Sequence, residues 1–142
     1  MPRSQTTMMA IRDWMNHHPE AGAALRRENP SYVFFRELTG DGPIGAEGVV
    51  LTAERSLAVD RGFVALGIPI WLEADERFAS ADPVRRLVVA QDIGGAIKGP
   101  VRGDLFWGTG AAAALRAGVM NARGRYYLLL PREVARRLSP EE

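Results

Sequence analysis

The sequence contains no cysteine, two histidines and a single lysine among its 142 residues. The lack of cysteine excludes disulfide bonds, thiolate metal sites and a cysteine nucleophile, and it leaves the redox compartment open. No stretch approaches the roughly 18 consecutive apolar residues of a spanning helix, and residues 1–14 lack the apolar run of a signal peptide. We therefore expect a soluble chain that makes no membrane contact of its own and has no export signal or lipid-anchor cysteine.

Neither sign of charge dominates the composition. The 18 basic residues nearly balance the 17 acidic ones, and 46% of the residues are hydrophobic. This balance argues against intrinsic disorder and against a dedicated nucleic-acid surface. His17 and His18 are adjacent and have no third ligand at helical or strand spacing, so the sequence predicts no metal site.

Residues 1–30 are expected to form a helical lead-in. Met9, Ile11 and Trp14 recur at helical spacing, and the pattern breaks at His18. Pro19 suits the first position of a second short helix, which we expect to end near residue 28. The remainder, residues 31–142, is expected to form one mainly β domain.

Short β-branched and aromatic segments separated by Gly, Pro and Asp follow from residue 32 onward, which is typical of strands and turns. We expect strands at residues 32–38, 48–51, 56–59, 68–73, 86–91, 104–107 and 126–130. Helices are expected at residues 111–121 and from Pro131 toward the C terminus. Strands and helices do not alternate as βαβ units require, so the pattern favours a small barrel over a layered α/β sheet.

Two aspartates flank a glycine-rich segment, DIGGAIKGPVRGD, at residues 92–104. Asp92 follows an apolar strand, on which it shares a face with Val88 and Ala90, and Asp104 opens another strand. Each acid is expected either on an exposed barrel rim or partly buried, where desolvation raises the pKa as a general acid requires. Turn acids that accept backbone N–H groups are the alternative, and spacing alone favours that interpretation.

The segment between the two aspartates combines open backbone with hydrogen-bond donors. Its glycines remove side chains where backbone can approach a ligand, and Lys98 and Arg102 supply donors. It is not a Walker phosphate loop, because Lys98 is followed by glycine and proline rather than by Ser or Thr at a helix start. Asp92, Ile93 and Gly94 also resemble the Asp-Thr-Gly turn of aspartic peptidases, a remote alternative that requires a homodimer.

Three stretches resemble, in order and spacing, the C-terminal part of the membrane-bound lytic murein transglycosylase A family, which contains the three-aspartate or 3D domain. They are RSLAVDRGFVALGIPIWLE (55–73), LVVAQDIGGAIKGPVRGDLFWGTG (87–110) and RAGVMNARGRYYLLLP (116–131). Residues 8–19 and 29–37 are similar to that family's lead-in. The resemblance implies a six-stranded double-psi β-barrel with short N-terminal helices and one or two C-terminal helices.

The resemblance also implies a set of site residues. Its three aspartates fall on Asp60, Asp92 and Asp104, of which Asp104 is the implied catalytic acid. The implied supporting residues are Asp60, Asp92, Lys98 and Arg102. The implied substrate-binding residues are Gly94, Gly95, Phe106 and Trp107, although residue type alone favours a core position for the aromatic side chains.

Enzymes of this family cleave the β-1,4 bond between N-acetylmuramic acid and N-acetylglucosamine in peptidoglycan without water, leaving a 1,6-anhydromuramic end. The resemblance therefore implies a lytic transglycosylase that acts on glycan strands in the periplasm or at the outer membrane, without metal or cofactor. Protonated Asp104 donates to the glycosidic oxygen and then accepts the proton of the muramic 6-hydroxyl as that oxygen attacks C1. The attack is intramolecular and needs no recruited water.

The family's chains are much longer, and their glycan groove lies between the barrel and a second, inserted domain. We expect that inserted domain to be absent here, and an N-terminal half to be missing. This departure favours one alternative from another functional class, a truncated, non-catalytic module that binds peptidoglycan or serves as a structural barrel.

Overall fold

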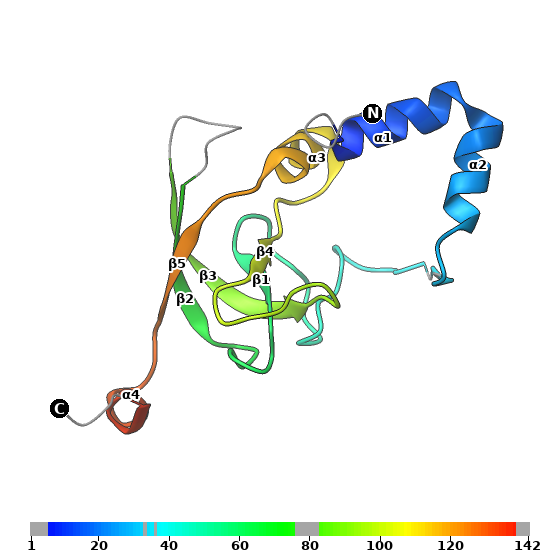
Figure 1. Ribbon diagram of the computed structural model, residues 1–142. Coiled ribbons are helices and arrows are strands. Elements are labelled where there is room, and N and C mark those ends of the chain that lie inside the picture. Colours follow the sequence, from blue (N-terminus) through cyan, green and yellow to red (C-terminus); the bar gives the residue numbers. More distant parts are fainter. Residues whose placement is uncertain (1–5, 33, 36, 76–82, 139–142) are drawn as a thin grey trace. The chain divides into compact units, whose positions relative to one another are not determined.

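The computed structural model describes residues 6–32, 34–35, 37–75 and 83–138 (Figure 1). The chain divides between Thr39 and Gly40 into two compact units, and all strands of the described residues belong to the second. The expected boundary at residues 30 and 31 falls before this division.

The first unit contains two helices, α1 (Met8–His17) and α2 (Pro19–Arg27). The Thr7 hydroxyl accepts a hydrogen bond from Ala10 N at 3.1 Å and caps α1, while Pro19 occupies the first turn of α2. His18 separates the helices, and its ring stacks on Trp14 with centroids 4.9 Å apart. Both helices are thus confirmed where the helical spacing and Pro19 predicted them.

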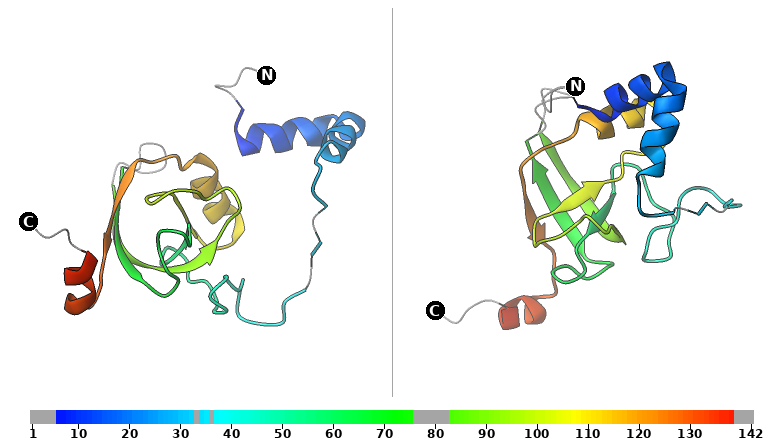
Figure 2. Two further views of the ribbon diagram at one scale, coloured as in Figure 1. Left: turned by 60° about the horizontal axis from the view of Figure 1, so that its bottom comes forward. Right: turned by 45° about the vertical axis from the view of Figure 1, so that its right-hand side comes forward.

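The second unit is built on one mixed sheet of five strands. These are β1 (Ser56–Val59), β2 (Pro69–Ala74), β3 (Val84–Ile93), β4 (Gly103–Leu105) and β5 (Gly124–Leu128). The strand order is β4-β1-β3-β2-β5, in which β1 and β3 are parallel and the other neighbours are antiparallel. Figure 2 shows that the sheet curls strongly about its own axis. The mainly β fold is confirmed, with five strands in the described part of the chain.

The remaining elements test the other expectations. Helices α3 (Gly110–Val119) and α4 (Arg132–Leu138) lie where the sequence predicted them. The predicted strands at 32–38 and 48–51 are wrong: the described residues of the first are in no strand, and the second contributes a single bridge between Ile44 and Val50. Phe34 and Phe35 are 86% and 94% exposed, so strand-like composition there meets no neighbouring strand.

The core lies on the inner face of the curled sheet. Alternate residues of β2 and β3 point inward, and those that are buried are Ile70, Leu72, Ala74, Val84, Val88 and Ala90. Arg86 occupies an inward position in this series, between Val84 and Val88, although it is a cation. An arginine on the core face requires a partner for its charge.

The two edge strands, β4 and β5, approach each other without pairing. A pocket of ≈ 420 Å³ lies between them, and its apolar lining includes Leu57, Leu72 and Leu105. Tyr126 of β5 spans this seam, because its hydroxyl oxygen lies 2.2 Å from the point where a Cβ on Gly103 of β4 would stand. A side chain of β5 therefore packs closely against β4, although the two strands share no hydrogen-bonded ladder.

Replacing Gly103 with alanine is expected to lower the free energy of unfolding by about 1–3 kcal/mol, because the seam has no room for a methyl group. The added Cβ would also lie 2.9 Å from the Ala58 carbonyl oxygen, which cannot move without disturbing β1. Urea denaturation measures the difference, with Gly95→Ala as control, since a Cβ on Gly95 meets nothing within 4 Å. Equal stabilities of the two variants would contradict the close contact at the seam.

The Tyr126 phenol is expected to titrate late. Burial raises its pKa to about 12, with Arg102 opposing the rise and Asp104 adding to it. Since the folded pKa lies above the usual 10.0, the stability contributed by the neutral phenol is complete below that value and is lost as the pH rises toward 12. Ultraviolet absorbance of the phenolate during alkaline titration checks this, and Tyr126→Phe should remove the late phase. Identical alkaline titration curves of the wild type and Tyr126→Phe near pH 12 would refute it.

Candidate functional site

The site is organised by one small residue, Ala58, in the middle of β1. Ala58 pairs with Asp92 of β3 on one side and with Asp104 of β4 on the other. Residues paired across neighbouring strands project from the same face of a sheet, so both carboxylates lie on the face that carries Ala58. Two strand spacings separate their backbones by about 9.5 Å. The alanine methyl group leaves the space between the two acids open.

A β-bulge brings Asp92 into this row. The register of β1 against β3 shifts between Leu57, which pairs with Ala90, and Ala58, which pairs with Asp92, so Gln91 is the extra residue. An extra residue bends the strand and re-aims the side chains that follow it. The Ser56 hydroxyl donates to Gln91 Oε1 at 2.6 Å, and the Gln91 carbonyl accepts from Glu47 N, which fixes the bulge from both sides.

A pocket of ≈ 280 Å³ lies over the alanine and is lined by both aspartates. Its other lining residues are Leu51, Ser56, Ala58, Ile93, Gly94, Ile97, Leu105 and Phe106. The pocket therefore presents two carboxylates, one aromatic edge and a mostly apolar floor, which suits a sugar ring with acid chemistry at one side.

Asp104 lies on the open rim of the pocket. Its side chain is 60% exposed and forms an ion pair with Arg102, whose Nη2 lies 3.1 Å from Asp104 Oδ1. An exposed pair of this kind contributes only about 0–1 kcal/mol, so the arginine can be displaced at little cost. Asp92 is half-buried, and its Oδ1 accepts a hydrogen bond from Ala46 N at 3.0 Å.

Asp60, the third aspartate, is placed differently. It follows β1 directly but does not line the pocket; its carboxylate accepts hydrogen bonds from Gly62 N at 3.0 Å and Gly99 N at 2.9 Å. These bonds, that from Gly99 first, and the nearby Lys98 charge hold the pKa of Asp60 below its ordinary value of 3.8. Asp60 is thus an ionised anchor for the loop between β3 and β4.

Of the predicted residues in the loop between β3 and β4, one lines the pocket and the others are exposed to solvent. Gly94 lines the pocket, and a Cβ there would lie 2.8 Å from the buried Ile97 side chain. Gly95 and Lys98 are exposed, and the positive charge of Lys98 is close enough to Asp60 to lower the pKa of that carboxyl. Gly99 has φ +109°, a conformation that favours glycine.

The two predicted aromatic residues lie in different environments. Phe106 is half-buried and lines the pocket beside the aspartates. Trp107 is 6% exposed, belongs to the hydrophobic core and is not among the residues that line the pocket. A ring buried on both faces offers no surface to a sugar, so the geometry gives these neighbours different roles.

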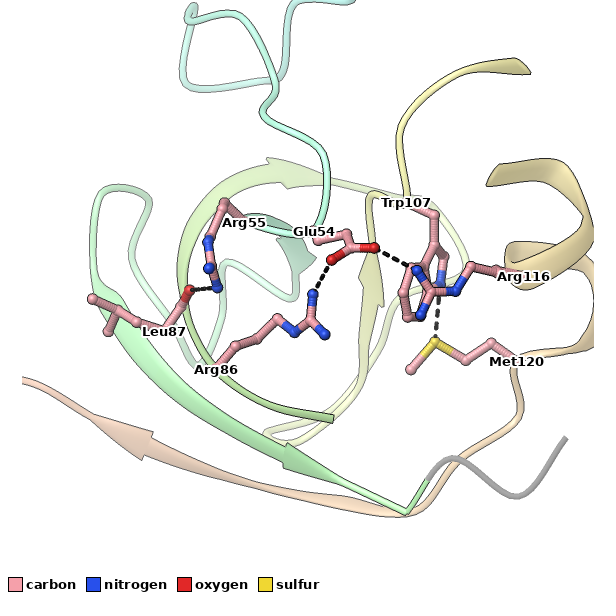
Figure 3. Close-up of polar contacts among 7 residues, drawn as sticks. All are labelled: Glu54, Arg55, Arg86, Leu87, Trp107, Arg116 and Met120. Carbon is pink, nitrogen blue, oxygen red and sulfur yellow. Dashed lines mark hydrogen bonds and ion pairs between the residues drawn. The ribbon is translucent and has the colours of Figure 1, made fainter. Parts of the chain in front are cut away.

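Sequence analysis missed a polar cluster around Trp107, just after the end of β4 (Figure 3). The Glu54 carboxylate forms ion pairs with Arg86 of β3 and with Arg116 of α3, the latter at 2.5 Å. The hydrogen bond from Arg86 leads the contributions that hold the pKa of Glu54 below its usual 4.5, against the opposing effect of burial. Both guanidinium groups cover the Trp107 ring, at 5.9 Å for Arg86 and 4.3 Å for Arg116. The sequence offered one indication of this cluster: Arg86 alternates with Val84 and Val88, so a cation occupies a position on the core face of the strand.

In residues 6–32, 34–35, 37–75 and 83–138, no three histidine or carboxylate side chains gather as a metal would require. No helix within those same ranges is long and apolar enough to cross a membrane.

Comparison with family models gives two matches along the chain. Residues 55–130 match the 3D domain, and residues 1–36 match the MltA specific insert domain. The first match spans the five strands and every residue that lines the pocket except Leu51. The second assigns the helical lead-in to the insert domain that the sequence analysis expected to be absent.

Individual relatives agree with these matches. The chain is 37% identical over 134 residues to membrane-bound lytic murein transglycosylase A of Escherichia coli K12, covering 89% of this chain and 36% of that protein. A membrane-bound lytic murein transglycosylase structure from Agrobacterium tumefaciens superimposes with a TM-score of 0.84 at 40% identity, over 96% of this chain and 38% of that one. The E. coli MltA structure with bound chitohexaose gives 0.78 at 35% identity, over 87% and 38%. The chain thus spans little more than a third of these relatives.

Replacing Asp60 with asparagine is expected to speed hydrogen exchange at the Gly99 amide, because a neutral carboxamide accepts more weakly than a carboxylate. The folded pKa of Asp60 is depressed, so its contribution is present above the ordinary carboxyl value and is lost as the pH falls through the lower folded value. The difference between wild type and variant should therefore disappear on acidification. Amide exchange followed by NMR measures it, with Asp75→Asn as control. Unchanged Gly99 exchange near neutral pH would contradict the anchor.

Proposed function

This chain belongs to the family of the membrane-bound lytic murein transglycosylases A, and we propose that it forms the catalytic barrel of a peptidoglycan lytic transglycosylase. The observation that carries the proposal is the row formed by Asp92, Ala58 and Asp104, in which two carboxylates line one pocket. The substrate is the glycan strand of peptidoglycan, cleaved at the β-1,4 bond between N-acetylmuramic acid and N-acetylglucosamine.

In this proposal Asp104 is the only proton carrier. Protonated Asp104 donates to the glycosidic oxygen, the bond from that oxygen to muramic C1 breaks, and the N-acetylglucosamine part leaves with a new hydroxyl group. The muramic 6-hydroxyl oxygen attacks C1 and gives its proton to the now ionised Asp104, which restores the acid. The product has a 1,6-anhydromuramic end, and no water is consumed.

The exposure of Asp104 supports this role, because the acid must reach a bond in a long polymer. Its pairing with Arg102 is exposed on both sides, so an incoming glycan can replace it. Arg102 is then free to meet a substrate carboxylate, such as the lactyl group. Asp92 projects from the same face and lines the same pocket, where it can accept hydrogen bonds from the sugar.

The remaining site residues serve binding in the proposal. Phe106 at the pocket edge offers an aromatic surface to a sugar ring, and Gly94 and Gly95 leave backbone open to approach. Asp60 and Lys98 act on the loop rather than on the sugar. Proton donation by Asp104 and attack by the 6-hydroxyl oxygen require no metal or cofactor.

The same family membership supports two finer proposals. The five curled strands are part of a six-stranded double-psi β-barrel, and the unpaired edges of β4 and β5 mark where its closure is incomplete. The chain acts in the periplasm, at the face of the outer membrane, where relatives named membrane-bound would meet murein.

The short span of the chain favours testing a second function, binding without turnover. The chain covers 36% of the E. coli relative, and the pocket opens on a rim rather than in an enclosed groove. A module of this kind would hold glycan strands but leave them intact. The two functions differ in product release, which the following experiment measures.

Purified chain incubated with murein sacculi is expected to release anhydromuropeptides detectable by mass spectrometry. Asp104→Asn keeps the side-chain shape but removes the transferable proton, and should lower release about 100-fold or more. Retained sedimentation of the variant with sacculi shows that binding survives.

The matched control is Asp75→Asn, which changes a carboxylate at the end of β2 and should release product at the wild-type rate. Undiminished release by Asp104→Asn would overturn the assignment of the acid. Sedimentation of the wild type with sacculi without any product would instead support the binding module.

A further inference from the structure

The polar cluster of Glu54, Arg86, Arg116 and Trp107 adjoins Phe106, which follows the end of β4 and lines the pocket together with Asp104. We propose that this cluster is a positioning device that fixes the Phe106 wall of the glycan pocket, with Glu54 as its central residue. The inference rests on the proposed function, and it adds to it a set of residues that touch neither acid.

The backbone of Glu54 is the first link to the pocket. Its φ of 61° makes it the one non-glycine residue with positive φ in the described part of the chain. Its N–H donates to the Phe106 carbonyl at 2.6 Å, and Phe106 N donates to the Ser56 carbonyl at 3.0 Å. Both bonds join Phe106 to residues 54–56, that is, to the turn and to the first residue of β1. A strained conformation persists only where its surroundings enforce it.

The carboxylate of Glu54 supplies that enforcement. It lies between two guanidinium groups, one from β3 and one from α3, as Figure 3 shows. Arg86 stands on the core face of β3 and is only 22% exposed, so it needs this counter-charge. One side chain therefore ties the turn before β1 to a strand and to a helix that are distant in sequence.

Trp107 carries the constraint to the pocket wall. The Arg116 guanidinium lies 4.3 Å from the centre of the Trp107 ring, and the indole N–H of Trp107 donates to Met120 Sδ at 3.2 Å. Trp107 directly follows Phe106, and the two side chains project to opposite sides of the strand end. Fixing Trp107 on the core side therefore sets the direction in which Phe106 meets the pocket.

A purely structural ion pair would affect stability alone, whereas a positioning cluster changes substrate binding selectively. Glu54→Gln is expected to raise KM for soluble glycan strands about tenfold, leave kcat within about twofold and leave the pH profile unchanged. The dissociation constant for chitohexaose, measured by calorimetry, should rise in parallel. A fall in kcat with unchanged KM would overturn the proposal, because it would place Glu54 with the chemistry of Asp104.

Coupling between the charges provides a second measurement. Arg116→Met alone should also raise KM, and the double variant should be no worse than the larger single effect, because the residues act as a unit. Simple addition of the two effects would contradict a shared cluster. Arg85→Met is the matched control, since Arg85 adjoins Arg86 on β3 but points outward and should change nothing.

A spectroscopic readout separates this inference from the proposed function. In a background with Trp14→Phe and Trp71→Phe, the remaining fluorescence reports Trp107 alone. Glu54→Gln or Arg116→Met should shift its emission, and Arg85→Met should not. If the chain neither cleaves nor binds glycan, the proposed function fails while this shift still tests the cluster; an unchanged emission in both cluster variants overturns the cluster itself.

Discussion

The pairing of β1 on both sides is the constraint on which the rest of the structure depends. Four residues join a parallel neighbour, β3, to an antiparallel neighbour, β4, and the sheet curls around them. Ala58 is the residue at which the two ladders bring Asp92 and Asp104 to one face. A larger side chain there would fill the space between the acids, and a shift of either strand by one residue would turn an acid away from the pocket.

The three aspartates have the same side chain, but their carboxylates contact different groups. Asp60 is satisfied by two backbone N–H groups and holds a loop. Asp92 is partly engaged, with one oxygen bonded to Ala46 N. Asp104 pairs with an exposed arginine, so of the three it can most easily exchange its partner for a substrate. This gradient from engaged to available is a physical basis for the different roles proposed for them.

Much of the fold was predictable because its signals are local. The helical spacing of Met9, Ile11 and Trp14 and the position of Pro19 located the first helices, and β-branched and aromatic composition located β2 and β3. Segment 32–38 has a similar composition, but a strand also needs a partner, which composition does not reveal. The bulge at Gln91 was beyond prediction for the same reason, since it is a property of two strands.

The candidate site was predictable only through resemblance. Spacing alone favoured turn acids at Asp92 and Asp104, and the resemblance added Asp60 and the assignment of Asp104 as the acid. The family also implied sugar contacts for Phe106 and Trp107 together, but alternation at a strand end sends one to the pocket and the other to the core. Glu54 stayed hidden because its partners lie 32 and 62 residues away along the chain.

The arginine-rich composition leaves Lys98 as the only lysine side chain, and the fold places it exposed on the loop that Asp60 anchors. Amine-directed reagents therefore modify one side chain of this protein, next to Ile97, which lines the candidate pocket. A fluorophore or cross-linker attached there reports on the loop in the unaltered sequence, without an engineered cysteine. Because lysine occurs once in the sequence, Lys98 is a natural labelling position beside the candidate site.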